Sequence, residues 1–165
     1  MTSELFEQLH DDLSRPHPFA FERVAFLSCK TAHLAGGGTV LLAHSAHVVA
    51  DDDYEPSETM GALLGSAAFR KILQYGYAHC VSIFHVHRHD HQGLPEFSKV
   101  DVQESAKYVP DFFKVRPNQP HGAIVLSHDS ATGLIWPSRI GKPEAIDGFV
   151  VVGARLLEIK NERRR

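Results

Sequence analysis

The chain has 165 residues, a formal net charge of −3, and ordinary shares of hydrophobic (43%) and charged (22%) residues. This length fits one compact domain with its own hydrophobic core. The slightly acidic balance gives no electrostatic reason to expect nucleic acid as a partner, and no apolar run approaches the ~20 residues of a membrane helix. Having only two cysteines, Cys29 and Cys80, argues against a disulfide framework and against a thiolate zinc ribbon.

The first part of the chain predicts a helix followed by a β-hairpin. Apolar residues recur at helical spacing from Leu5 to Leu13, which predicts a short amphipathic helix that the following prolines end. Residues 21–30 and 39–50 are apolar and rich in β-branched or aromatic side chains. Three glycines at positions 36–38 separate them, so the two stretches are predicted to form a hairpin.

The middle of the chain predicts two helices around a buried strand. An apolar stripe from Met60 to Ile72 predicts a helix that starts after Ser57 and stops at Gly76. Residues 81–86 predict a buried strand that runs directly into a histidine-rich stretch. A helical pattern returns at residues 98–108 and is expected to end before the next proline.

The last part of the chain predicts a second hairpin and a final strand. Residues 123–127 and 134–136 form the hairpin around a short polar turn, and residues 148–159 are read as one strand. We find no internal repeat and no linker long enough to divide the chain. The predicted fold is therefore a single α/β (α+β) domain over residues 1–165, with a central mixed β-sheet flanked by helices.

The chemistry is concentrated after the buried strand at residues 81–86. The sequence contains 12 histidines, and histidine is the commonest metal ligand. His85 and His87 lie two apart at the strand end, so their side chains should face the same side. Asp101, at the start of the next helix, can supply a third ligand. Two histidines and one aspartate leave the fourth tetrahedral position open to water, as in catalytic zinc sites.

Each of these elements also has a plain structural interpretation. A His-x-His pair is common on protein surfaces, and Ser98-x-x-Asp101 matches the helix capping box, which requires no metal. Their order, at a strand end and then a helix start, favours one zinc ion per chain held by His85, His87 and Asp101. His89 and His91 are assigned to the loop that follows, near a substrate or in solvent.

The run His85-x-His87, a loop and then Ser98-x-x-Asp101 resembles the JAMM signature of the JAB/MPN zinc metalloproteases. In that family the two histidines and the aspartate bind zinc, the serine assists catalysis, and a glutamate near an early strand is the proton-transfer group. Glu22 is the matching glutamate, so the resemblance implies Glu22 and Ser98 as catalytic residues. The family usually places seven residues between the second histidine and the serine, whereas ten separate His87 from Ser98 here.

The resemblance implies a zinc-dependent isopeptidase or peptidase that cleaves the amide bond after the C-terminus of a ubiquitin-like protein, in deconjugation or in maturation. Short bacterial members of this kind accompany ubiquitin-like proteins and their E1- and E2-like enzymes, and some belong to antiviral defence operons. The expected partners are therefore a ubiquitin-like protein or its conjugates and E1/E2-like proteins, with no nucleic acid or membrane. The acidic N-terminus is unlike a secretory signal, so a cytoplasmic location is expected.

Other functions compatible with the sequence are an inactive MPN-type scaffold that only binds partners, and a peptidase acting on a sulfur-carrier protein. The metallo-β-lactamase motif H-x-H-x-D-H fits less well, because His89-Asp90 reverses its last two positions. Amidohydrolase barrels also carry His-x-His, but they need about 250 residues.

Overall fold

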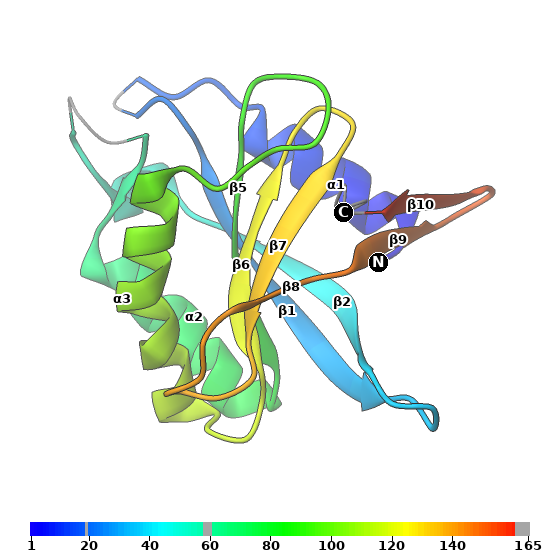
Figure 1. Cartoon of the computed structure of the whole chain (residues 1–165). Helices are drawn as coiled ribbons and strands as arrows, with labels where there is room; N and C mark the ends of the chain where they lie inside the picture. The colour runs from blue at the N-terminus through cyan, green and yellow to red at the C-terminus, as the bar shows by residue number, and fades with distance from the viewer. Residues whose placement is uncertain (19, 58–60, 161–165) are drawn as a thin grey trace.

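The computed structural model describes residues 1–18, 20–57 and 61–160 and shows three helices around a six-stranded sheet (Figure 1). The strand order is β2-β1-β5-β6-β7-β8, in which β5 and β6 are parallel and the other neighbours antiparallel. The strands are β1 (Val24–His33), β2 (Thr39–Val48), β5 (Ser82–Arg88), β6 (His121–Leu126), β7 (Ala131–Trp136) and β8 (Glu144–Ala145). The predicted α+β class with a mixed central sheet and flanking helices is confirmed.

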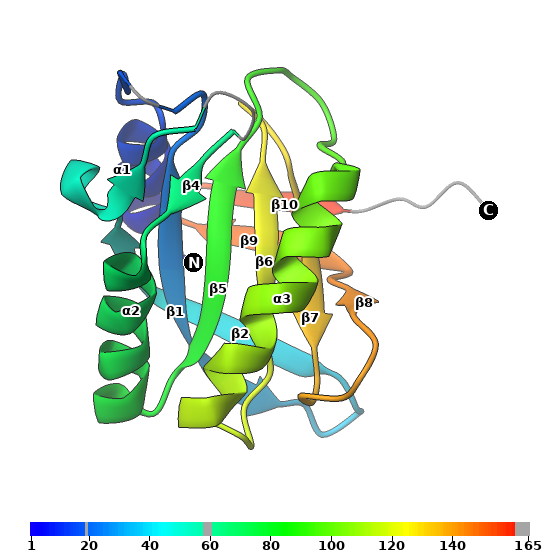
Figure 2. The ribbon, with the colours of Figure 1, turned by 90° about the vertical axis from the view of Figure 1, so that its left-hand side faces the viewer.

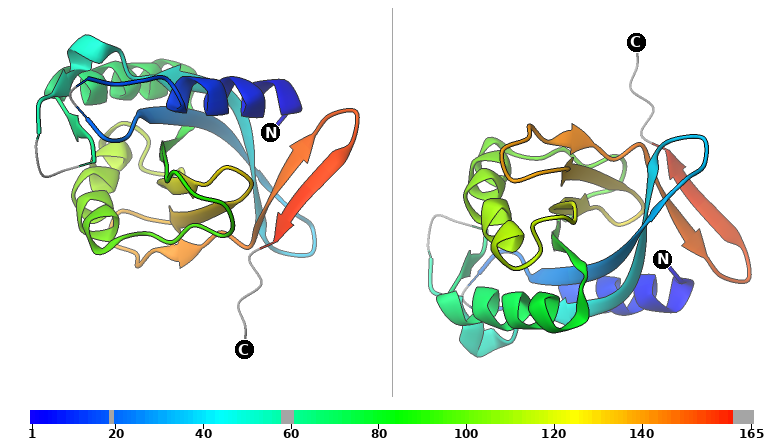
Figure 3. Two further views of the ribbon diagram at one scale, coloured as in Figure 1. Left: turned by 90° about the horizontal axis from the view of Figure 1, so that it is seen from above. Right: turned by 90° about the horizontal axis from the view of Figure 1, so that it is seen from below.

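The helices lie on both faces of this sheet. They are α1 (Ser3–Leu13), α2 (Ser66–His79) and α3 (Lys99–Val115), with a single 3-10 turn, η1 (Asp51–Asp53). Figure 2 shows α2 and α3 in front of the sheet, with α1 behind it. Two small antiparallel sheets complete the fold, β3 (Tyr54–Glu55) with β4 (Leu63–Leu64) and β9 (Gly148–Val152) with β10 (Leu156–Lys160). Seen from above and below, the β9–β10 hairpin lies on the opposite side of the sheet from α3 (Figure 3).

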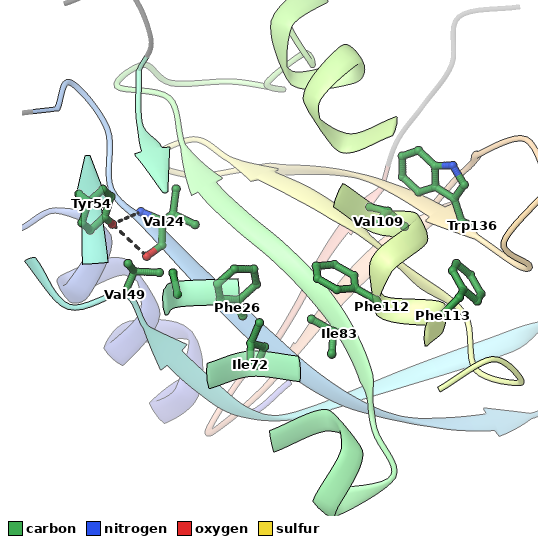
Figure 4. Packing of buried hydrophobic residues seen from close by; sticks show 11 residues of the cluster. Val24, Phe26, Val49, Tyr54, Ile72, Ile83, Val109, Phe112, Phe113 and Trp136 are labelled. Carbon is green, nitrogen blue, oxygen red and sulfur yellow. Dashed lines mark hydrogen bonds between the residues drawn. The ribbon is translucent and has the colours of Figure 1, made fainter. Parts of the chain in front are cut away.

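Alternation along the central strands divides the interior into two hydrophobic cores. In β1, Val24 and Phe26 face α2 and α3, whereas Ala25 and Leu27 face α1. The first core is drawn in Figure 4, where the Tyr54 hydroxyl also hydrogen-bonds the backbone N–H and C=O of Val24 at 2.8 and 3.3 Å. In β5, Ile83 belongs to the same core. The histidines at positions 85 and 87 therefore emerge on the α2–α3 side of the sheet.

The predicted N-terminal helix and the first hairpin are confirmed. The Thr2 hydroxyl caps α1 by accepting the N–H of Leu5 at 3.3 Å, and Leu5, Leu9 and Leu13 form its buried stripe. Strands β1 and β2 pair antiparallel from Ala25–Val48 to His33–Thr39, with one irregularity after Ser28.

The predicted bounds of the second helix are wrong. Helix α2 begins at Ser66, after the short strand β4, and Met60 lies outside the described residues. The helix also runs through Gly76, where a stop was expected. A Cβ atom at Gly76 would lie 2.7 Å from the Cδ1 of Ile83, so this glycine allows the helix to approach the sheet closely.

Two further predictions need correction. Helix α3 continues through Pro110 to Val115, because Phe112 and Phe113 beyond the proline are buried in the core and the proline removes only one helical hydrogen bond. The stretch predicted as one final strand is the β9–β10 hairpin, which turns between Val152 and Leu156.

His121 gives the fold an acid-sensitive element. Its Nδ1 accepts the backbone N–H of Ile83 and its Nε2 contacts the carbonyl oxygen of Arg116, both at 3.0 Å. The ring is fully buried, and this burial lowers the pKa of His121 from 6.5 to about 4, although the contact of Nε2 with the Arg116 carbonyl acts in the opposite direction. The native ring therefore stays neutral at pH values where the unfolded chain binds a proton.

Acidification from pH 6.5 toward 4 should therefore destabilise the metal-free protein through His121. Above pH 6.5, His121 is neutral in both the folded and the unfolded protein, and its contribution to the free energy of unfolding is complete. Between pH 6.5 and 4 only the unfolded protein binds a proton at this residue, so the free energy of unfolding falls as the pH falls. The shift corresponds to a loss on the order of 3 kcal/mol. Denaturant unfolding of the parent and His121→Asn at pH 7 and pH 4.5 measures this, and an equal loss in both proteins would contradict the assignment.

Candidate metal centre

Three histidines follow one another along the same side of the chain at the end of β5. His85 and His87 belong to β5, and the N–H of His89 still bonds the carbonyl oxygen of Leu126 at 2.9 Å. The extended course of the chain is therefore kept past the last residue of the strand. Alternation then directs His89 to the same side as His85 and His87.

Four side chains from three parts of the chain meet at this point. The Nε2 atoms of His87 and His89 are 3.2 Å apart. The carboxylate of Asp101, in the first turn of α3, lies 3.4 Å from His87 Nε2 through Oδ1 and 3.7 Å from His89 Nε2 through Oδ2. Glu22, which precedes β1, lies 4.0 Å from His89 Nε2 through Oε1. One donor atom each of Glu22, His87 and His89 falls within 4.8 Å of the others.

This spacing suits a metal ion. Bonds of about 2.0–2.1 Å at tetrahedral angles put two donor nitrogens of a zinc ion roughly 3.3 Å apart. The separations among His87, His89 and Asp101 are close to that value, and imidazole nitrogen with carboxylate oxygen is a donor set that zinc prefers. The residues present therefore fit a metal ion held through the Nε2 atoms.

The pKa shifts of His89 and Asp101 also favour metal binding by these two residues. Burial, followed by the neighbouring His87, lowers the pKa of His89, although Glu22 and Asp101 act in the opposite direction. Burial alone would raise the pKa of Asp101, but hydrogen bonds and charge from His87 and Ser98 outweigh it and lower the pKa. A neutral imidazole and an ionised carboxylate are the forms that bind a metal.

Glu22 is held beside the cluster by the segment before β4. The backbone N–H groups of Phe21 and Glu22 both donate to the carbonyl oxygen of Gly61, at 2.8 and 3.0 Å. A Cβ atom on Gly61 would lie 2.7 Å from Glu22 Oε2, so any larger residue would displace the carboxylate. The side chain of Glu22 is 31% exposed, which leaves it open to water and substrate.

Ser98 acts on the cluster through Asp101. Its hydroxyl accepts the N–H of Asp101 at 3.1 Å, and Asp101 Oδ2 accepts the N–H of Ser98 at 2.7 Å. This capping box is the structural role anticipated for the Ser98-x-x-Asp101 pattern, and it fixes the carboxylate at the N-terminus of α3. Ser98 itself is exposed.

Removing the cap should cost stability. Replacing an N-cap serine by alanine lowers the free energy of unfolding by about 1 kcal/mol, and Ser98→Ala should show a loss of this size in chemical denaturation. Ser98→Thr keeps the hydroxyl and should recover most of it. A Ser98→Thr protein as unstable as Ser98→Ala would show that the hydroxyl does not cap α3.

His85, which the sequence predicted as a ligand, lies further from the end of β5 than His87 and His89. Its ring contacts Phe26 at 5.7 Å and Tyr108 at 4.8 Å between centroids, and its Nδ1 is buried with no hydrogen-bond partner among the described residues. Burial, followed by His87, lowers the pKa of His85 to about 3, so the ring is neutral. Neither His85 nor Asp101 is part of the group of donor atoms that lie within 4.8 Å of one another.

The donor atoms that lie within 4.8 Å of one another belong to Glu22, His87 and His89, and the Asp101 carboxylate lies 3.4 and 3.7 Å from the two histidine Nε2 atoms, whereas the sequence predicted His85, His87 and Asp101. His89 is the residue that the sequence analysis placed on the loop. The spacing in the sequence could have pointed to His89. Eight residues separate His89 from Ser98, which is closer to the seven usual in the JAMM signature than the ten that separate His87 from Ser98. The structure brings Glu22, His87 and Asp101 together as expected.

A pocket of about 150 Å³ opens beside the cluster. Glu22, His85, His87 and Asp101 contribute to its walls, together with the segment Gly61–Leu64 from the opposite side. Its remaining lining is mostly apolar and aromatic: Val24, Phe69, Val100, Glu104 and Tyr108. A substrate can therefore reach the candidate metal ligands from a pocket that combines an apolar wall with a few polar groups.

Comparison with protein-family models and with curated protein sequences finds no match to this chain. None of the helices in the described ranges is long and apolar enough to cross a membrane. The geometry defines a candidate metal site in which Glu22, His87 and His89 could hold an ion, with the Asp101 carboxylate beside both histidines.

Proposed function

We propose that this protein is a zinc-dependent peptidase of the JAMM type that cleaves the amide bond after the C-terminus of a ubiquitin-like protein. The observation that carries the proposal is the convergence of Glu22, His87, His89 and Asp101 at the end of β5. A second observation supports it: the order of these residues along the chain follows the JAMM pattern of glutamate, His-x-His and Ser-x-x-Asp.

In this proposal His87, His89 and Asp101 would hold a zinc ion, which would supply a Lewis acid and a water of lowered pKa. Glu22 lies beside this set and accepts the proton of the attacking water, then delivers it to the leaving amine. Its exposure and its position against Gly61 allow the carboxylate to reach both groups.

We propose that Ser98 also assists catalysis, in addition to capping α3. The capping bond uses an acceptor lone pair of its hydroxyl, so the hydroxyl hydrogen is available to a substrate oxygen. Donation to the oxygen of the scissile carbonyl would stabilise charge that develops there. Asp101 stays ionised and oriented through the same capping box.

An extended substrate tail fits the segment that faces the cluster. Strand β4 pairs only with β3 among the described strands, and Gly61–Leu64 lines the pocket. A C-terminal tail can add to β4 as a further strand through backbone hydrogen bonds, which is a common way to bind extended peptides. This placement brings the terminal amide bond toward Glu22 and the metal ligands.

The test is cleavage of two substrates, ubiquitin fused through its C-terminus to a reporter protein and ubiquitin joined to a lysine side chain. We expect the zinc-loaded protein to cleave at least one of them, a chelator to abolish cleavage, and added zinc to restore it. Cleavage of the fusion protein would indicate maturation, and cleavage of the lysine-linked ubiquitin would indicate deconjugation. A protein that binds zinc but cleaves neither substrate would contradict the proposal and would fit a binding scaffold.

A further inference from the structure

A second, larger cavity lies on the face of the sheet opposite the candidate metal centre. It measures about 250 Å³ and is enclosed by the sheet, α1, β2 and the β9–β10 hairpin. Its deep wall includes Leu27, Phe84 and Leu126, each at most 2% exposed, whereas Thr39 and Val150 at its rim are exposed. The cavity therefore leads from the surface into the second hydrophobic core.

The lining determines what chemistry the cavity can accept. No charged side chain is found among the described residues that line it, and nearly all of the lining side chains are apolar. The charged amino group of Met1 lies at the outer wall, where it donates to the Val150 carbonyl at 2.8 Å. Cys29 contributes a thiol, and burial raises its pKa to about 12, so this group is uncharged as well. A charged ligand group in the deep part, against Leu27, Phe84 and Leu126, would lose its hydration without gaining a partner.

We propose that this cavity is a binding site for an uncharged hydrophobic small molecule. Its volume exceeds the cavity of about 150 Å³ that stays dry and binds benzene when lined by aliphatic and aromatic side chains. Without a ligand, the side chains around such a space lose van der Waals contacts on one side, and a hydrophobic ligand restores them. The exposed rim gives the ligand a route in.

The outer wall of the cavity can yield without breaking the main sheet. The β9–β10 hairpin is a separate two-stranded sheet. Two hydrogen bonds of 2.8 Å join β9 to the N-terminus: the Val152 N–H donates to the Met1 carbonyl, and the Met1 amino group donates to the Val150 carbonyl. The inner wall is rigid, because Phe84 belongs to β5 and Leu126 to β6, two central strands. A ligand would thus lie directly behind the strand that carries His85 and His87.

Cys29 provides a reporter for the test. In a Cys80→Ser protein, Cys29 is the remaining cysteine, and its reaction with a neutral maleimide is followed with and without 1-octanol. We expect saturating octanol to slow the labelling at least tenfold and to raise the Tm. Ala43→Leu and Ala131→Leu place larger side chains in the cavity and should each remove both effects. Ala78→Leu, at an exposed position of α2, is the matched control and should keep them.

Absence of both octanol effects in the Cys80→Ser protein would overturn the proposal. Octanol effects that persist in the two filling variants would also overturn it, because the ligand would then bind elsewhere. If one filling variant fails to fold, the other still decides. The measurement uses metal-free protein and no peptidase substrate, so its outcome is independent of the proposed function.

Discussion

Replacing Glu22 with glutamine should lower the rate of substrate cleavage by about two to four orders of magnitude, which is the range that a positioned acid–base group contributes. Glutamine keeps the size of the side chain but cannot accept the proton of the attacking water. In the proposal Glu22 is the proton-transfer group and not a ligand, so bound zinc should remain near the parental level. Its carboxylate lies 4.0 Å from His89 Nε2, within reach of a metal ion, so the measurement decides between the two roles. Single-turnover cleavage and metal analysis of the same preparation measure both quantities.

Glu104→Gln is the matched control for this result. Glu104 lines the same pocket from α3, and its carboxylate is paired with Lys107 at 2.5 Å, away from the histidine cluster. We expect Glu104→Gln to retain most of the activity. If Glu22→Gln instead loses its zinc, Glu22 is a ligand and not the proton-transfer group. Equal losses in the two variants would show that pocket charge, and not a specific base, is responsible.

Truncating Phe112 should produce the largest loss of stability in the first core. Its ring is fully buried and lies beside Phe26 in the first core (Figure 4). It contacts Phe26, Tyr108 and His121 at 5.8–6.3 Å between ring centroids. Phe112→Ala removes these contacts and leaves a cavity, which typically costs about 3–5 kcal/mol. Equilibrium unfolding in urea at pH 7 measures the change.

Phe21→Ala makes the same chemical change at a site that is 79% exposed, and it should alter the free energy of unfolding by less than about 0.5 kcal/mol. A similar loss in both variants would mean that the α2–α3 core is not packed as described. Because Tyr108 also contacts His85, the Phe112 variant should additionally disturb the floor of the pocket.

The general fold could be predicted from local patterns. The leucine stripe of α1, the apolar strands β1 and β5, and the β6–β7 hairpin all show periods that match their secondary structure. The errors fall where tertiary packing overrides a local signal. Gly76 and Pro110 normally end helices, but close packing on Ile83 and burial of Phe112 and Phe113 keep both helices intact.

The candidate site was predictable in its composition but not in its register. Glu22, His87 and Asp101 could be identified from the JAMM-like pattern, and Ser98 from the capping box. The apolar pattern of the strand stops at His87, so nothing local shows that the chain stays extended to His89. Pairing with Leu126 of β6 keeps it extended, and this contact spans 37 residues of sequence.

Bound zinc in the parent and in two single variants, His85→Ala and His89→Ala, tests the central claim most directly. The parent should carry about one zinc per chain when prepared without chelator. His89→Ala should lose the metal, because one ligand is removed from an already minimal set, whereas His85→Ala should keep it. Retention in His89→Ala with loss in His85→Ala would contradict the structure-based ligand set, and absence of zinc from the parent would contradict the metal centre itself.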